Sequence, residues 1–237
     1  MMLTMQSRNT QDTVIPLAGF GLVTVLLPLV TFHITYLVSA SQGHVEWCVP
    51  YWDACTSISA TGHHGAGYFI FKGAMIPGIT LQVIFWAINH QWLKSLGYPR
   101  GKGVGWLGFA AGVCFLPYVL SLGHVGEGFE LARRIGTVGN VGLTGIVQIL
   151  LGAVLWRSPY PLLMRGGRRL LMLSGFTLGV AMLSLILQSI PAVDWDSIKY
   201  AFDWNLIILI NLHGVGIVQL WWKSGLAVTL PRTMNLE

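Results

Sequence analysis

The chain has 237 residues, of which 54% are hydrophobic and only 10% charged, whereas a soluble domain carries about 25% charged residues. Such a chain cannot cover itself with a polar surface, so lipid must form part of its solvent. The formal net charge is +5, but the basic residues lie between apolar stretches rather than in one patch. Membrane topology and anionic lipid explain this pattern better than nucleic acid does. We therefore expect an integral membrane protein with membrane lipid, and no nucleic acid, as its partner.

Six stretches reach the roughly 20 mostly apolar residues that a spanning helix needs. They are residues 14–40, 66–92, 103–123, 135–156, 168–190 and 201–222. Strand-like alternation is absent and the runs are too long for barrel strands, which favours helices. The first stretch is longer than a signal-peptide core, so we interpret it as a retained anchor. The prediction is an all-α polytopic membrane protein, with a six-helix transmembrane domain at 14–222 between an N-terminal segment (1–13) and a C-terminal tail (223–237).

Lysine and arginine orient the bundle, because they collect in cytoplasmic loops. Ten of the 14 lie on one predicted side and only Lys72, Arg133, Arg134 and Lys199 on the other. The ten are Arg8, Lys94, Arg100, Lys102, Arg157, Arg165, Arg168, Arg169, Lys223 and Arg232. Both termini and the tail are then cytoplasmic, and loop 41–65 is extracytoplasmic or lumenal.

The fourth stretch contains glycine at 136, 139, 142 and 145 in IGTVGNVGLTG. Small residues let a second helix approach closely within lipid. We expect the face formed by Gly136, Gly139, Gly142 and Gly145 to pack against another helix, in this chain or in a membrane-protein partner. The spacing is not that of a dinucleotide-binding loop and follows no strand.

The polar stretch PYWDACTSISATGHHG (50–65) separates the first two spans. A zinc ion needs three or four ligands, but the adjacent His63 and His64 point in different directions on any regular element. A site would require His124 or Glu127 to converge on this loop, and two solvated histidines are the alternative. We predict no metal and no cofactor. Haem would have to use His33 and His213 without a C-x-x-C-H motif.

Two further features of the loops leave alternatives open. Cys48 and Cys55 could close a disulfide if their compartment is oxidising. His124, Glu127 and Glu130 would share a face if a helix continued through them, which suggests an acid/base pair. The alternative is a solvated loop whose carboxylates offset the charges of Arg133 and Arg134.

Several polar residues fall inside predicted spans. Lys72 lies one to two turns inside the second span, where it could hold a lipid phosphate, pair with Asp203 or extend toward the interface. Asn211 and His213 lie mid-span, where neutral polar side chains most often bond a neighbouring helix.

The segments GLVTVLLPLVTF, CVPYWDACTSISATG and YFIFKGA resemble the Frag/DRAM/Sfk-type family of six-helix membrane proteins, which includes post-GPI-attachment lipid-remodelling factor, as do LWR (155–157) and LWW (220–222). The resemblance covers most of the chain and implies lipid handling, such as remodelling of the fatty acids of GPI anchors. Ser57, Ser59 and Gly62 match the loop motif, and Lys72, Asp203 and His213 match polar positions of the spans. The sequence departs from the family at the start of the fourth span, where Ala132 or Arg133 replaces a histidine.

These observations predict a protein that binds or remodels lipid through an outward-facing polar pocket. Ser57, Ser59 and Lys72 are the candidate lipid-binding residues. In a catalytic version His124 or His213 acts as base and Asp203 orients it, although no nucleophile motif is present. A non-catalytic scaffold is the alternative, and a transporter path lined by Asn140, Asn211 and His213 is a third hypothesis.

Overall fold

The computed structural model describes residues 13–98 and 101–230. Arg8, Arg100 and Arg232, which contribute to the predicted orientation, lie outside these ranges. Six described helices are long and apolar enough to cross a membrane, which confirms the predicted polytopic helical bundle. They are α1 (Ala18–Ser41), α3 (Gly65–Ser95), α4 (Lys102–Ser121), α5 (Glu127–Trp156), α6 (Pro161–Ser189) and α7 (Lys199–Lys223). Short elements join or flank them: α2 (Ile58–Thr61), η2 (Trp195–Ser197), β1 (Thr13–Pro16) and β2 (Ala227–Leu230).

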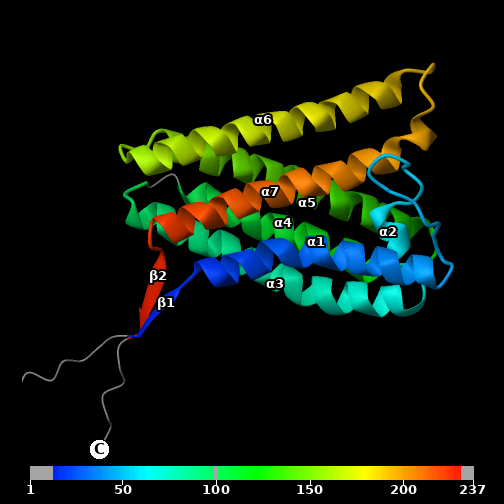
Figure 1. Ribbon diagram of the computed structural model, residues 1–237, viewed down its shortest axis with the longest axis horizontal. Coiled ribbons are helices and arrows are strands. Elements are labelled where there is room, and N and C mark those ends of the chain that lie inside the picture. Colours follow the sequence, from blue (N-terminus) through cyan, green and yellow to red (C-terminus); the bar gives the residue numbers. More distant parts are fainter. Residues whose placement is uncertain (1–12, 99–100, 231–237) are drawn as a thin grey trace, which may run out of the picture.

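The six long helices run side by side (Figure 1), and their contacts follow a closed ring. Each packs chiefly on the next one along the chain, and α7 completes the ring by packing on α1. Contacts across the ring, such as those between α5 and α7, are few. Apart from the long connection between α1 and α3, short loops explain this order, because a short loop places consecutive helices side by side.

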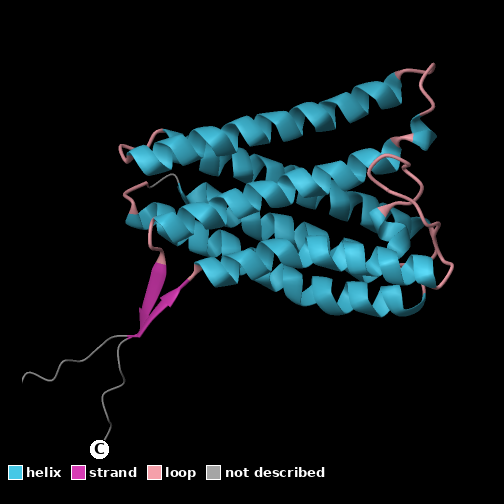
Figure 2. Ribbon diagram, viewed as in Figure 1, coloured by secondary structure: helices cyan, strands magenta, loops and turns pink. Residues whose placement is uncertain are grey.

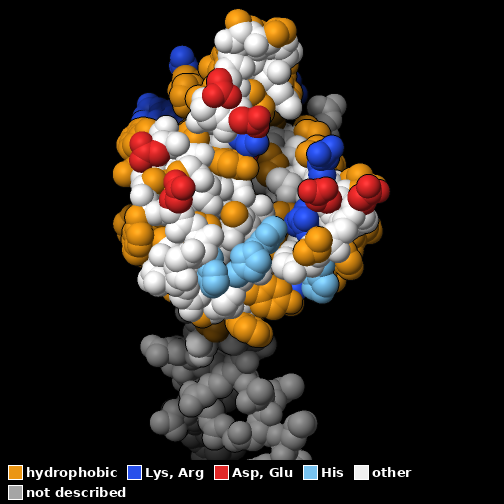
Figure 3. Space-filling view, turned by 90° about the vertical axis from the view of Figure 1, so that its right-hand side faces the viewer, with side chains coloured by type: hydrophobic (Ala, Val, Ile, Leu, Met, Phe, Trp, Pro, Cys, Tyr) orange, Lys and Arg blue, Asp and Glu red, His pale blue; other side chains and the backbone are white. Residues whose placement is uncertain are grey.

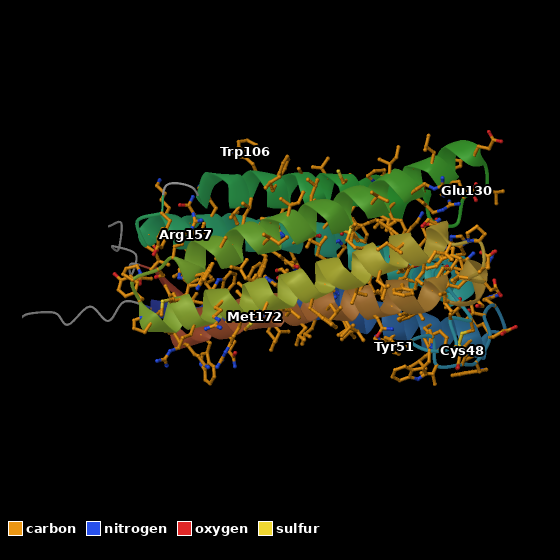
Figure 4. All side chains as sticks on the ribbon, turned by 90° about the horizontal axis from the view of Figure 1, so that it is seen from above. Cys48, Tyr51, Trp106, Glu130, Arg157 and Met172 are labelled. Atoms are coloured by element: carbon orange, nitrogen blue, oxygen red, sulfur yellow. A yellow bond between two sulfur atoms is a disulfide. The ribbon has the colours of Figure 1, made fainter. Side chains whose placement is uncertain are left out.

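The two ends of the described chain meet beyond one end of the ring (Figure 2). Strand β1 pairs antiparallel with β2, with Thr13 opposite Leu230 and Pro16 opposite Ala227. The Leu17 amide extends this contact by donating to the Leu226 carbonyl at 3.1 Å. The two ends of the described chain therefore lie together at the same end of the bundle. In Figure 4, Arg157 lies at one end of the bundle and Glu130 with Cys48 at the other. Which end faces the cytoplasm stays a prediction from the charges.

Some helix boundaries differ from those expected. Helix α5 begins at Glu127 rather than 135, and α6 at Pro161 rather than 168. The apolar pattern marks only the part suited to lipid, whereas a helix continues through charged residues with good helix propensity. The first turn of α6 also has proline at its start, where a missing N–H costs nothing. Conversely, residues 14–16 belong to β1 and not to the first helix.

Two buried cores fill the ends of the ring. Near the strands, one core contains Trp92, Leu155 and Trp221. At the opposite end, the second contains Phe71, Leu122 and Trp204. Trp204 and Trp221 are fully buried, so each end of the bundle is closed by packed aromatic and aliphatic side chains, with the middle left between them.

The glycine face of α5 is used partly within the chain. A Cβ at Gly136 would lie 2.9 Å from the Cys114 carbonyl oxygen, and one at Gly139 would lie 2.9 Å from the Cys114 Cβ. These two glycines thus permit the close packing of α5 on α4, as small residues do in membranes. Gly142 and Gly145 have no such neighbours within 4 Å. Packing of a partner protein on this face stays a prediction.

Candidate functional site

A cavity of about 600 Å³ occupies the middle of the ring, and its wall includes residues of all six long helices. Most of the wall is apolar, with side chains such as Phe32, Met75 and Ile207. Its polar residues include Ser57, Ser59, Gln82, Asn140, Thr144, Gln148, Asp203 and Asn211. A largely apolar cavity with a few polar groups is the usual form of a small-molecule site.

The loop before α2 is tied to α1. A disulfide joins Cys48 and Cys55, whose Cα atoms are 6.6 Å apart. The Tyr36 hydroxyl of α1 donates to the Cys48 carbonyl oxygen at 2.7 Å and accepts from the Cys48 amide at 2.8 Å. These contacts hold the first part of the loop over the end of the bundle, where Cys48 and Tyr51 are seen in Figure 4.

The same loop is tied to α7 through Trp204. The buried indole Nε1 donates to the Thr56 carbonyl oxygen at 3.0 Å. Its ring packs edge-on against His33, Tyr36 and Tyr51, and such aromatic pairs add stability beyond their buried area. The Asn205 amide also donates to the Tyr51 carbonyl oxygen at 3.0 Å. Ser57, the next residue after Thr56, is consequently held at the cavity.

Ser57 and Ser59 lie at the start of α2. Ser57 is the N-cap, and its hydroxyl accepts from the Ala60 amide at 3.1 Å. The two serine hydroxyls are 3.1 Å apart and both residues line the cavity. Thr61 anchors this short helix by bonding Thr35 of α1 at 3.0 Å. The signal for α2 was present in the sequence, because serine is a favoured N-cap residue.

Asp203 lies one turn into α7 and lines the same cavity as the two serines. The described residues contain one ion pair, Lys199–Asp196 at 2.5 Å, so Asp203 has no cationic partner among them. The ion pair with Lys72, one of the alternatives that the sequence left open, is therefore not formed.

Lys72 is engaged at the end of α4. Its ammonium donates to the Leu120 carbonyl oxygen at 3.0 Å and to the Tyr68 hydroxyl at 2.8 Å. Arg133 of α5 donates to the Ser121 and His124 carbonyl oxygens at 3.0 and 2.9 Å. The last carbonyls of a helix lack partners within it and attract cations. Lys72 and Arg133 thus complete the C-terminus of α4, and neither lines the central cavity.

His213 is fully buried, and neither ring nitrogen has a hydrogen-bond partner among the described residues. The expected bond to a neighbouring helix is absent. Ser174 of the adjacent helix α6 is also buried, and its hydroxyl likewise has no partner in the part of the chain that the structure describes. His213 does not line the cavity, whereas Asn140 and Asn211 do.

A separate pocket of about 390 Å³ lies at the end of the bundle opposite the strands. Figure 3 shows histidine side chains together on this end, beside acidic and basic ones. The pocket is lined by His63, His64, Gly123, His124, Val125, Gly126, Glu127, Glu130 and Arg133. Although the histidine pair and Glu127 converge here, the described residues contain no group of three His, Cys, Asp or Glu placed to hold a metal ion.

Two properties of this second pocket, which His63, His124 and Arg133 help to line, follow from its local structure. Gly126, with φ of 128°, is the N-cap of α5. His124 therefore precedes the helix, and the alternative in which one helix face carries His124, Glu127 and Glu130 is not realised. Burial lowers the pKa of His63 from its ordinary value of 6.5, and the charge of Arg133 lowers it further. Both effects favour the neutral form of the His63 ring.

The three catalytic candidates occupy three different places. His124 lines the second pocket, His213 is buried in the packing between helices, and Asp203 lines the central cavity. Ser57, Ser59 and Asp203 line the same cavity. Gln82 and Gln148 line it as well, and sequence reasoning missed them because their apolar surroundings gave no motif. This arrangement is suited to holding an amphiphilic molecule. Comparison of the chain with family models, with curated proteins and with solved structures finds no match.

Proposed function

We propose that this integral membrane protein binds a lipid, with an acyl chain in the central cavity and the polar head beside Ser57, Ser59 and Asp203. The supporting observation is the cavity itself, which is apolar along most of its wall and polar where the loop and the start of α7 meet. Its volume of about 600 Å³ falls within the range of sites for drug-sized molecules.

The length of the cavity matches one leaflet. Along α7 its wall runs from Asp203 to Gly214, a rise of about 16 Å at 1.5 Å per residue. The hydrocarbon core of a bilayer is about 30 Å thick, so the cavity extends from one interface to about the middle. Beyond Gly214, the buried Ile217 and Trp221 close it with packed side chains. A chain entering from one leaflet would fill it.

Helix α6 offers a route for lipid from the bilayer. Its first half is packed, with Leu163, Gly167, Leu170 and Ser174 buried, but none of residues 175–189 is buried. The looser half nevertheless contributes Ala181, Ser184 and Leu185 to the cavity wall. A wall held by few contacts opens at low cost, and the space beyond it is lipid. This favours a membrane lipid over a water-soluble ligand.

Two glycines of α5 give a matched test. Gly142 lines the cavity and Gly145 does not, while both have open space beside them, with nothing within 4 Å of the point where a Cβ would lie. Gly142→Phe would fill the cavity, and Gly145→Phe would place the same ring outside it. Lipid mass spectrometry of purified protein should show one tightly held lipid in the wild type and Gly145→Phe and its loss in Gly142→Phe. Equal lipid content in all three proteins would overturn the proposal.

Remodelling of the bound lipid is the finer proposal. It is supported by the resemblance of the loop CVPYWDACTSISATG to the Frag/DRAM/Sfk-type family, whose members handle GPI anchors and other lipids. The separation of His124, His213 and Asp203 favours binding without assembled acid/base chemistry. Incubating the protein with an acyl-labelled phospholipid or GPI-anchored substrate and measuring release of labelled fatty acid distinguishes the two. Release that exceeds that of the Asp203→Asn variant supports remodelling, and no release leaves binding alone.

A further inference from the structure

The wall of the central cavity carries one negative charge and no positive charge. Asp203 is the only Asp, Glu, Lys, Arg or His among the described residues that line it. Neither nearby cation forms an ion pair with the carboxylate: Lys199, one turn earlier on α7, pairs with Asp196, and Lys72 bonds the end of α4. Asp203 is an exposed residue of the cavity wall, and a carboxylate is an acceptor with several lone pairs, so it can accept from a donor supplied by a ligand or by water.

The amide side chains of the wall increase the excess of acceptors. Asn140 donates its amide group to the Ala111 carbonyl oxygen at 2.9 Å, and Gln148 donates to that of Ile210 at 3.1 Å. Asn211 donates to the Ile207 carbonyl oxygen at 2.7 Å. Because a carbonyl oxygen can only accept, each of these amides must present its nitrogen to the backbone. Its own oxygen remains as an acceptor without a donor among the described residues.

From this imbalance we infer that the lipid held in the cavity carries a head that donates hydrogen bonds, an amine or hydroxyl groups, and that no phosphate is seated there. This inference rests on the proposed function. A phosphate monoester would approach the Asp203 carboxylate with like charge and would find no cation. An ammonium or hydroxyl head would satisfy Asp203 and share the hydroxyls of Ser57 and Ser59. A charge-assisted hydrogen bond of this kind contributes about 1.5–3 kcal/mol, or at least about tenfold in affinity.

Three single-chain lipids with the same chain length test the inference: a long-chain amine, a monoacylglycerol and a lysophosphatidic acid. Native mass spectrometry of delipidated full-length protein would measure the occupancy of each. We expect the amine or the monoacylglycerol to bind at least about tenfold more tightly than the lysophosphatidic acid. Asp203→Asn should weaken binding of the amine by at least that factor and should weaken binding of the monoacylglycerol much less. The difference distinguishes an amine head from a hydroxyl head. Asp194→Asn removes an exposed carboxylate outside the cavity and should leave the binding of both lipids unchanged.

The outcomes separate this inference from the proposed function. Tightest binding of the lysophosphatidic acid, blocked by Gly142→Phe, would overturn the donor-head inference and leave lipid binding intact. Binding of the long-chain amine that Asp203→Asn weakens no more than Asp194→Asn does would also overturn it. Binding of none of the three lipids, together with equal native lipid content in wild type and Gly142→Phe, would overturn both.

Discussion

The indole of Trp204 and the carbonyl oxygen of Thr56 are 148 residues apart in sequence and joined by a 3.0 Å hydrogen bond. Both residues are next to a residue of the cavity wall in the sequence: Ser57 follows Thr56, and Asp203 precedes Trp204. One buried contact between the loop and α7 thus places the hydroxyls and the carboxylate at the same end of the cavity. Trp204 also belongs to the core that closes the end of the bundle opposite the strands.

Trp204→Phe should remove this hydrogen bond and leave a small void. We expect the free energy of unfolding to fall by about 1–3 kcal/mol, because the Thr56 carbonyl stays buried without its donor. Thermal unfolding in nanodiscs measures the change. The matched variant Trp222→Phe replaces a side chain that is 71% exposed and should alter stability by no more than about 0.5 kcal/mol. Equal effects of the two substitutions would argue against the anchoring role.

Lys72→Met should lower stability without lowering the lipid content of the purified protein. The methionine keeps most of the apolar stem but cannot donate to the Leu120 carbonyl at the end of α4. A lost cation at a helix C-terminus costs about 1 kcal/mol. Thermal unfolding and lipid mass spectrometry on the same sample check both parts. Loss of lipid with an unchanged unfolding temperature would contradict this prediction and would support Lys72 as a ligand of the lipid headgroup.

The glycines of α5 should respond unequally to alanine. At Gly136 a Cβ would meet the backbone of Cys114 and Tyr118 at 2.9 Å, so Gly136→Ala should force α5 from α4 and destabilise by about 1–3 kcal/mol. At Gly145 the space is open, and alanine should stabilise the helix by up to about 1 kcal/mol. Unfolding temperatures of the two variants in one detergent provide the measurement. A destabilising Gly145→Ala would instead reveal a partner packed on that face.

His63 should make stability depend on pH. The pKa of His63 is lowered in the folded protein from 6.5, so well above pH 6.5 the side chain is neutral in both states and does not make stability depend on pH. Below that pH the unfolded chain takes up the proton more readily, and stability decreases. His63→Gln should make this decrease smaller. His44→Gln, at an exposed position of the same loop, should leave it unchanged. Identical pH profiles of unfolding temperature for the two variants would contradict the assignment.

Long apolar runs made the six helices predictable, because a spanning helix must satisfy its backbone internally and face lipid with apolar side chains. The serine N-cap at Ser57 and the acidic Asp203 were also recognisable as unusual polar residues near the membrane. Their meeting at one cavity depends on the Trp204–Thr56 contact, which has no local sequence pattern. The role of Lys72 could not be predicted for the same reason, since its partner is a backbone carbonyl of another helix.

Similar limits apply to His213 and the strand pair. His213 lies on α7 near residues that line the cavity, but its side chain points in another direction. The sequence of α7 has no pattern that separates a lipid face from a cavity face, so this direction could not be predicted. Strands β1 and β2 are four residues each and lie at opposite ends of the chain. The two strands pair because α7 packs on α1 and brings them together. Such distant pairing leaves no periodic pattern in the sequence.

Photolabelling tests the central claim, a lipid chain inside the ring of helices, most directly. The protein in nanodiscs would be exposed to a monoacyl lipid carrying a diazirine on its chain, and the labelled residues would be located by peptide mass spectrometry. We predict labels on cavity residues such as Ile207 and Ile210 that disappear in Gly142→Phe and persist in Gly145→Phe. Labels confined to outward-facing residues such as Phe176 and Met182, which are 61% and 49% exposed, would contradict the account.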